Sequence, residues 1–375
     1  MRALVLLTAA LLAPRVVLAQ LVAEEVARFE LEGVNSLGIS MALDSRMVLL
    51  GAVGPGAYIF QYDGANWWME TLRANGEPWD VTRVSLHGDL ALLGVAPIAV
   101  LYRNNGRAWD QEAFFQEDEL QSEKAVAVGR DVALVASPSH AVYVYRFDGR
   151  EWRREARLAP ERGEGQGDPH GFARELALDE DRALVLKDST IGDDFEGTYV
   201  FAFDGAAWRQ EAVLVIEDAA SPFQGAIALH GDVALIGVGY EDEVHVFRRD
   251  GQAWRREAVL VPPDLGSACA CLSSSPGGIP PCSTERGDYR NFGVSVAVFG
   301  DLALVGAIKG DGGANEGAAY VFRFDGACWK HEISIAAPST LGFGRTVALH
   351  ESDALIRTNS ANRGAYLFRI RERDQ

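Results

Sequence analysis

The chain has 375 residues, and its 35 Lys and Arg residues are outnumbered by 53 Asp and Glu residues, which gives a formal net charge of −18 at neutral pH. This balance disfavours a nucleic acid partner, because nucleic acid binding depends on clustered Lys and Arg side chains that neutralise phosphates. Strong acidity favours solubility outside the cell and suits divalent cations.

The first segment has the pattern of an export signal. Arg2 is followed by an apolar run from Ala3 to Ala13, and small residues precede Gln20. A basic start, a short apolar stretch and small residues before the cleavage point are typical of a signal peptide. We therefore expect residues 1–19 to be removed and residues 20–375 to form one secreted, periplasmic or cell-surface domain. The apolar run has roughly half of the ~20 residues that a membrane-spanning helix needs, so no transmembrane segment is expected.

One unit recurs along the rest of the chain. It consists of Phe-Gly, an alternating apolar strand, a Gly-Asp turn, Ala-Leu-Val-Gly-Ala, a variable loop, Gly-Ala-Tyr-Val-Phe, an Asp-Gly turn, and then Trp and Glu. The clearest copy runs from Phe292 to Glu332. The turn before the second strand occurs seven times, at Ser45-Arg46, Gly88-Asp89, Arg130-Asp131, Glu180-Asp181, Gly231-Asp232, Gly300-Asp301 and Ser352-Asp353.

The spacing of these turns predicts the fold. The runs between turns are short, rich in Val, Ile, Tyr and Phe, and joined by Asp-Gly or Asn-Gly, which supply the positive φ that tight hairpins need. Four strands in a period of ~40 to 50 residues are typical of propeller blades. We therefore predict an all-β, seven-bladed β-propeller with four-stranded antiparallel blades. The blades are expected near residues 37–72, 81–115, 124–158, 171–214, 223–260, 291–335 and 342–370.

The two ends of the chain each carry part of a blade. The last repeat ends at Leu367-Phe368-Arg369 without a Trp-containing strand, while residues 22–32 precede the first repeat without three strands before them. We expect this N-terminal strand to complete the last blade. Such closure leaves no long unpaired sheet edge between the first and last blades.

The motif Phe-Gly, Ser-Val-Ala, Gly-Ala and Tyr-Val-Phe resembles the FG-GAP repeat family, which includes the propeller heads of integrin α-subunits and many exported bacterial proteins. The resemblance covers nearly all of the chain after the export signal. It implies a propeller, and it leaves the function open because folds of this kind host many functions.

The resemblance also implies calcium, which FG-GAP propellers often hold in an Asp-x-Asp-x-Asp-Gly loop after the Gly-Ala strand. Two such loops are long and acidic in this chain, and calcium prefers six to eight oxygen ligands from a flexible loop. The candidate ligands are Asp188, Asp193, Asp194 and Glu196 in the fourth blade, and Asp311, Asn315 and Glu316 in the sixth. Neither loop keeps the family's full Asp spacing, so solvated turns are the alternative.

Tryptophan is placed at a repeated position. A repeated aromatic residue is best explained by packing between adjacent blades, although an aromatic face can also stack on a sugar ring. We assign to this position Trp68, Trp109, Trp152, Trp208, Trp254 and Trp329. Trp79 lies outside the repeat in a connecting loop, and it is the candidate for a ligand-contacting aromatic residue.

The four cysteines predict disulfide bonds. Cys269, Cys271 and Cys282 lie in a Ser-, Gly- and Pro-rich insertion at residues 262–290, and Cys328 lies in the sixth blade. An even number of cysteines in an exported chain favours disulfides. Cys269 and Cys271 are too close to bond to each other without strain, so one is expected to pair with Cys282 and the other with Cys328. A zinc site is the alternative, but the usual Cys-x-x-Cys pairs are absent.

No sequence signature of catalysis is present: the chain has no Gly-x-Ser-x-Gly, His-Glu-x-x-His or phosphate-binding Gly-rich motif. We therefore predict a monomeric, non-enzymatic binding module. Its loops would bind a protein or an extracellular polymer or glycan, with calcium as the only expected cofactor. The alternatives are a lectin-like carbohydrate binder that uses Trp79 and an unrecognised metal-dependent enzyme, since propeller centres can host active sites.

Overall fold

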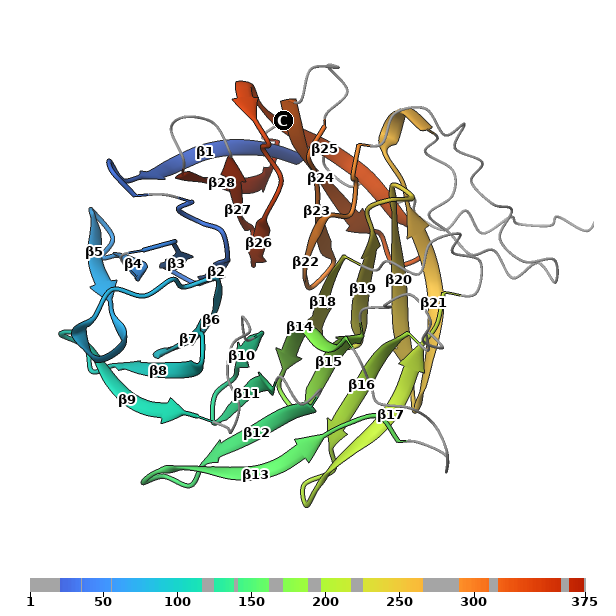
Figure 1. Cartoon of the computed structure of the whole chain (residues 1–375). Helices are drawn as coiled ribbons and strands as arrows, with labels where there is room; N and C mark the ends of the chain where they lie inside the picture. Colours follow the sequence, from blue (N-terminus) through green and yellow to red (C-terminus); the bar gives the residue numbers. More distant parts are fainter. Residues whose placement is uncertain are drawn as a thin grey trace, which may run out of the picture.

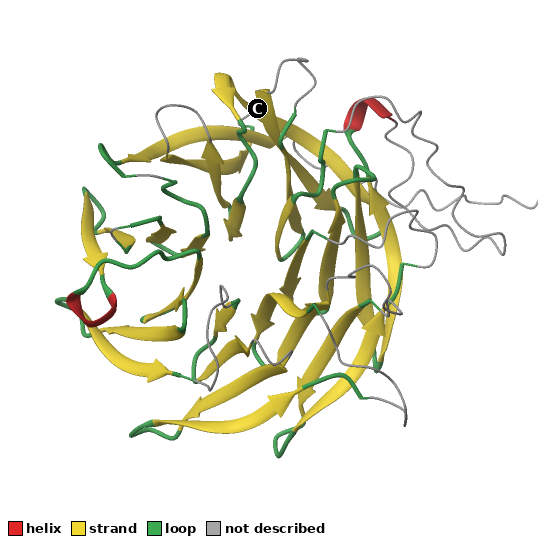
Figure 2. Cartoon of the chain, in the orientation of Figure 1, coloured by secondary structure: helices red, strands yellow, loops and turns green. Residues whose placement is uncertain are grey.

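The computed structural model describes residues 21–34, 36–54, 56–116, 125–137, 141–161, 171–187, 197–216, 225–265, 290–309, 316–358 and 364–373. These residues form seven four-stranded antiparallel sheets arranged as blades in a ring (Figure 1). Figure 2 shows strands joined by loops and turns, with two short 3-10 helices in the described chain, η1 (Ala74–Gly76) and η2 (Pro263–Leu265). The predicted all-β, seven-bladed propeller is confirmed.

In blades 1 to 6 the strands follow chain order from the axis outward. Blade 1 contains β2 (Met41–Asp44), β3 (Met47–Gly51), β4 (Ala57–Tyr62) and β5 (Trp67–Leu72). Blade 2 contains β6 (Arg83–His87), β7 (Leu90–Val95), β8 (Ile98–Asn104) and β9 (Trp109–Phe115). Blade 3 contains β10 (Val126–Val128), β11 (Val132–Ser137), β12 (Ala141–Phe147) and β13 (Trp152–Leu158). Blade 4 contains β14 (Phe172–Asp179), β15 (Arg182–Lys187), β16 (Thr198–Phe203) and β17 (Trp208–Leu214).

The remaining blades follow the same plan. Blade 5 contains β18 (Ala226–His230), β19 (Val233–Val238), β20 (Glu243–Asp250) and β21 (Ala253–Leu260). Blade 6 contains β22 (Ser295–Phe299), β23 (Leu302–Ala307), β24 (Glu316–Phe324) and β25 (Trp329–Leu341). Blade 7 contains β26 (Val347–His350), β27 (Asp353–Thr358) and β28 (Gly364–Glu372), and its outer strand is β1 (Leu21–Glu30).

The pairing of β1 with β28 closes the ring. The two strands run antiparallel from Leu21 opposite Glu372 to Glu30 opposite Gly364, and Figure 1 shows the blue β1 lying along the dark red β28. The expected completion of the last blade by the N-terminal strand is confirmed. The ring therefore closes through backbone hydrogen bonds between the two ends of the described chain.

Neighbouring blades share their apolar cores. The cluster between blades 1 and 2 contains Leu49 and Ile59 from one blade and Leu93 and Val100 from the other, all of them fully buried. Where blades approach most closely only glycine fits: a Cβ atom on Gly306 would lie 1.9 Å from the carbonyl oxygen of Gly344 in the next blade. Each blade thus completes the core of its neighbour, as expected for a repeat protein.

The strand register corrects one assignment from the sequence. Trp152 lies opposite Phe147 at the start of its hairpin, and the residue in the same place in blade 1 is Trp67, opposite Tyr62. Assigning Trp68 to the repeated position was therefore wrong. Because side chains alternate between the two faces of a strand, this single step turns Trp68 away from the place of the packing tryptophan.

Candidate binding site between blades 1 and 2

A repeated set of side chains, the interblade clamp, joins one blade to the next. Between blades 2 and 3, Arg103 binds Glu112 of its own blade and the turn residue Asp89, at 2.9 Å. Trp152 of blade 3 donates its indole N–H to Glu112 at 2.6 Å. The Arg103 guanidinium carbon lies 5.1 Å from the ring centre of Phe147, also in blade 3. The clamp therefore combines an ion pair, a charge-assisted hydrogen bond and a cation–π contact.

The same set recurs in later blades. Between blades 3 and 4 the arginine is Arg146, with Glu155, Asp131, Trp208 and Phe203 around it. Between blades 5 and 6 it is Arg248, with Glu257, Trp329 and Phe324. Between blades 4 and 5 alanine takes the arginine position, but Arg182 and Arg249 both bind Glu211, which also accepts a hydrogen bond from Trp254. In each of these cases the glutamate keeps a cation and an indole donor.

Between blades 1 and 2 the clamp is missing. The register places Gln61 at the arginine position, opposite Met47 as Arg103 is opposite Leu90. The turn aspartate is replaced by Arg46, and the phenylalanine of the next blade is replaced by Asn104, which lies opposite Trp109. In the described part of the chain, the Gln61 side chain forms one hydrogen bond, from its amide nitrogen to the Met47 sulfur at 3.6 Å.

The outer strand of blade 1 also lacks a β-bulge. β5 has six residues from its first Trp to its last Leu, whereas β9, β13 and β17 have seven from the Trp to the last strand residue. In those strands the clamp glutamate is the extra residue of a bulge. Glu70 instead pairs regularly with Ile59. Since a bulge re-aims the side chains around it, its loss gives Glu70 a direction different from that of the clamp glutamates.

Polar groups at this interface are left without clamp partners. Among the described residues, Glu70 accepts only two long contacts, 3.4 Å from each carboxylate oxygen to the backbone nitrogen of Trp109. The indole nitrogen of Trp109 is buried and has no hydrogen-bond partner within the described ranges. Among the described residues, Arg46, Arg107 and Glu70 form no ion pair. This pattern distinguishes the first interface from the compensated one between blades 4 and 5.

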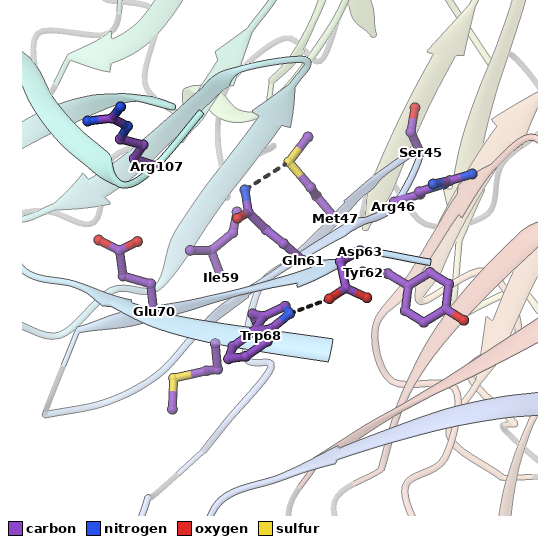
Figure 3. Close-up of a pocket in the computed structure, with 11 residues that line it drawn as sticks. Ser45, Arg46, Met47, Ile59, Gln61, Tyr62, Asp63, Trp68, Glu70 and Arg107 are labelled. Carbon is purple, nitrogen blue, oxygen red and sulfur yellow. Dashed lines mark hydrogen bonds between the residues drawn. The ribbon is translucent and has the colours of Figure 1, made fainter. Parts of the chain in front are cut away.

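The missing clamp leaves a pocket of about 620 Å³ at the rim of blade 1. Figure 3 shows the side chains that line it, with Glu70 and Arg107 on one side and Arg46 and Tyr62 on the other. The complete lining is Ser45, Arg46, Met47, Ile59, Gln61, Tyr62, Asp63, Trp68, Met69, Glu70 and Arg107. Its volume lies within the ~300 to 1,000 Å³ range of small-molecule sites.

Trp68 and Met69 give the pocket an exposed apolar wall. Trp68 is 63% exposed and Met69 is 47% exposed. The corresponding pairs in other blades are polar or charged: Asp110 and Gln111, Arg153 and Arg154, Arg209 and Gln210, Arg255 and Arg256, and Lys330 and His331. An exposed apolar pair at a position that otherwise carries polar residues indicates a contact surface.

Asp63 holds the Trp68 ring in place. The indole nitrogen of Trp68 donates a hydrogen bond of 2.7 Å to one carboxylate oxygen of Asp63 (Figure 3). The other oxygen accepts backbone N–H groups of Ala65 and Asn66 in the hairpin turn, each at 2.7 Å. The Trp68 hydrogen bond, followed by those from the backbone, lowers the pKa of the Asp63 carboxyl. Asp63 is therefore ionised at neutral pH and fixes one orientation of the indole.

Trp79, the aromatic candidate from the sequence, lies apart from this pocket. It is half-buried, packs against the core shared by blades 1 and 2, and lines a pocket of about 380 Å³ with Pro78 and Asp80. Its indole nitrogen is buried and has no partner in the part of the chain that the structure describes. Its role as a ligand contact stays a prediction.

Most of the predicted calcium ligands and cysteines lie outside the described residues, namely Asp188, Asp193, Asp194, Glu196, Asp311, Asn315, Cys269, Cys271 and Cys282. Glu316 begins β24, where its backbone lies opposite Leu341. Cys328 is disulfide-bonded, and its predicted pairing stays a prediction. No three His, Cys, Asp or Glu side chains within the described ranges form a group that could hold a metal ion.

The described helices are too short to cross a membrane.

The ring of seven four-stranded blades places the protein in the class of seven-bladed β-propellers. A family model of the FG-GAP repeat matches residues 285–322, which include the start of blade 6. Together with the seven blades, this match supports an FG-GAP-type propeller, a kind of protein that is generally an interaction module and typically not catalytic.

Solved structures show the same fold. One, described as YCF48 bound to D1 peptide, has a TM-score of 0.53 and 14% identity over 97% of this chain and 99% of that one. A chain from the crystal structure of the mitotic checkpoint complex has a TM-score of 0.57 and 12% identity over 98% of both chains. No curated protein matches the sequence. At these identities the likeness concerns the fold alone, and 900 matching chains make the fold too common to define a function.

Proposed function

We propose that this protein is an exported, non-catalytic binding module whose ligand binds in the pocket between blades 1 and 2. The observation that carries the proposal is the loss of the interblade clamp between blades 1 and 2. Gln61 and Arg46 replace clamp residues, and nothing in the described chain compensates Glu70. Loss of packing without compensation weakens a fold, so a pocket formed in this way is better explained by binding than by stability.

The exposed wall of the pocket supports the same proposal. Trp68 places a large aromatic surface in solvent at a position where blades 3, 4 and 5 carry arginine. Exposed tryptophan is rare on surfaces without a partner and is enriched at binding sites. Asp63 fixes the indole, which reduces the conformational entropy that binding would cost.

One group of side chains at the edge of the pocket has the composition of a catalytic triad but not its geometry. Ser45 donates its hydroxyl to Asp44 at 3.0 Å, and the same hydroxyl lies 3.5 Å from Nε2 of His350. The Asp44 carboxylate lies 3.8 Å from that same nitrogen. In a serine triad the acid binds the opposite ring nitrogen and the serine donates to the histidine. This arrangement does not activate Ser45, which favours a binding role.

Calcium and disulfide bonds are proposed as supports of the propeller. Calcium would bind in the blade 4 loop that contains Asp188 and Glu196 or in the blade 6 loop that contains Asp311, since both loops offer several oxygen ligands. The disulfides would attach the insertion at residues 262–290 to blade 6 through Cys328.

The binding proposal is tested by array binding with a matched control. Residues 20–375, the Trp68→Arg variant and the Arg153→Ala variant are applied in parallel to a glycan array and a displayed-peptide library. Arg153 occupies the position of Trp68 in blade 3. We expect a ligand that the parent and Arg153→Ala retain and Trp68→Arg loses. Retention of the ligand by Trp68→Arg, or no retention on either array, would contradict the proposal.

A further inference from the structure

We infer that the ligand of this pocket is an uncharged carbohydrate, bound with one pyranose ring stacked on Trp68; the inference rests on the proposed function of the same pocket. A pyranose presents apolar C–H groups on its faces and hydroxyl groups around its edge. A fitting site therefore needs an exposed aromatic face with hydrogen-bonding side chains around it.

Trp68 supplies the stacking platform. Trp68 is 63% exposed, and its one polar side-chain atom, the indole nitrogen, donates to Asp63 at 2.7 Å. The electron-rich face is therefore the part of the side chain that is free for a ligand, and such faces attract the slightly positive C–H groups of a sugar. The Tyr62 hydroxyl donates to the carbonyl of Gly64 at 2.9 Å, so toward a ligand it can act only as a hydrogen-bond acceptor.

The strand pairing places polar groups beside this platform. Gln61 lies directly opposite Trp68, and Glu70 follows two residues further along β5 on the same face. The Gln61 amide can donate hydrogen bonds to the hydroxyls of a sugar and accept hydrogen bonds from them, and the Glu70 carboxylate can accept hydrogen bonds from neighbouring hydroxyls. Arg107 reaches the same pocket from the β8–β9 turn of blade 2 and adds donors (Figure 3).

The charges of the pocket favour an uncharged ligand. Arg46 and Arg107 contribute two positive charges, and Asp63 and Glu70 contribute two negative charges. A strongly anionic or cationic ligand would meet both signs, whereas an uncharged polyol can bind acceptors and donors together without burying a net charge.

The same groups disfavour a protein ligand. A protein–protein interface buries about 800 Å² on each partner and is depleted of charged residues at its centre. Here the exposed apolar surface of the pocket is small, consisting of Trp68, Met69 and part of Tyr62, and charged side chains stand on both sides of it. An apolar side chain seated in this pocket would desolvate Glu70 without offering it a donor, which is unfavourable.

The inference is tested with neutral oligosaccharides of defined sequence. An array of neutral, uronate-containing and sulfated glycans is probed with residues 20–375, and the affinity of the retained glycan is measured by isothermal titration calorimetry. We expect a neutral glycan to be retained. Trp68→Ala should lower its affinity at least tenfold, and Trp68→Phe, which keeps an aromatic face, should recover part of the loss.

Two further variants separate direct contact from unfolding. Glu70→Gln keeps the size of the side chain and should lower the affinity by about tenfold through the loss of charge-assisted hydrogen bonds. Arg153→Ala lies in another blade and should leave the affinity unchanged. All variants must keep the parent's thermal unfolding midpoint to within about 2 °C for these comparisons.

The other outcomes show whether the carbohydrate inference fails alone or the binding site fails with it. Retention of charged glycans alone would overturn the uncharged ligand. Retention of a peptide but no glycan, with the peptide lost in Trp68→Arg, would overturn the carbohydrate and leave the binding site. Equal glycan affinity in the parent and in Trp68→Ala would overturn stacking on Trp68.

Discussion

Removing the clamp glutamate should destabilise the propeller at an intact interface and not at the first one. In Glu112→Ala, Arg103 loses a partly exposed ion-pair partner, and the indole N–H of Trp152 loses its acceptor at 2.6 Å. The ion pair contributes about 0.5 to 1 kcal/mol after solvent screening, and the hydrogen bond to a charged acceptor about 1 to 2 kcal/mol. We expect Glu112→Ala to lower the free energy of unfolding by about 2 kcal/mol.

The matched variant is Glu70→Ala. Glu70 has only two contacts of 3.4 Å to the backbone of Trp109 and no ion pair among the described residues. Its removal should change the free energy of unfolding by less than about 0.5 kcal/mol. Urea denaturation of both variants and the parent gives the two differences from the midpoints, provided that the m-values agree. A loss in Glu70→Ala equal to that in Glu112→Ala would refute the view that the first interface lacks a clamp.

Three further predictions concern the whole propeller. Asp204 and Asp325 have pKa values of about 2, below the ordinary 3.8, because a cationic side chain and turn N–H groups bind each carboxylate. Their stabilisation is present above about pH 4 and lost as the pH falls toward 2, so the unfolding midpoint measured against pH should drop in that window and stay flat from pH 5 to 7. Gly306→Ala would place a Cβ atom 1.9 Å from the carbonyl oxygen of Gly344, and it should cost more than about 3 kcal/mol of stability in urea denaturation; a loss below 1 kcal/mol would mean that blades 6 and 7 are less closely packed. Calcium should raise the midpoint of the EDTA-treated protein in a saturating way, by the equivalent of about 2.7 kcal/mol at a hundredfold excess over Kd, and replacing the carboxylates of residues 188–196 should abolish that rise if the blade 4 loop holds the ion.

The fold could be predicted from the sequence because each blade repeats the same turns and strands. Seven turn signals and the incomplete repeats at both ends determine the number of blades and the pairing of β1 with β28. Repetition averages out the local ambiguity that usually limits such predictions. The error at Trp68 arose where two tryptophans are adjacent. Counting four residues from the Asp-Gly turn, as from Asp148 to Trp152, selects Trp67.

The binding pocket could be predicted only in part. Arg46 in place of the turn aspartate, the single tryptophan pair at Trp67 and Trp68 and the shorter outer strand are all visible in an alignment of the repeats. An alignment does not show that these features meet in one place, because that depends on which face of its strand each residue occupies. The register and the missing bulge bring Gln61, Glu70 and Trp68 to the same face of blade 1.

The central claim is that loss of the clamp opens a binding site between blades 1 and 2. The most direct test is the double variant Arg46→Asp/Gln61→Arg, which restores the arginine and aspartate present at these positions in blades 2 and 3. Its unfolding midpoint and its ligand affinity are measured beside the parent. We predict a midpoint equal to or about 1 to 2 °C above that of the parent. We also predict at least a tenfold loss of affinity, since the longer side chain at position 61 fills part of the pocket beside Trp68. A properly folded double variant that binds the ligand as tightly as the parent would contradict the claim.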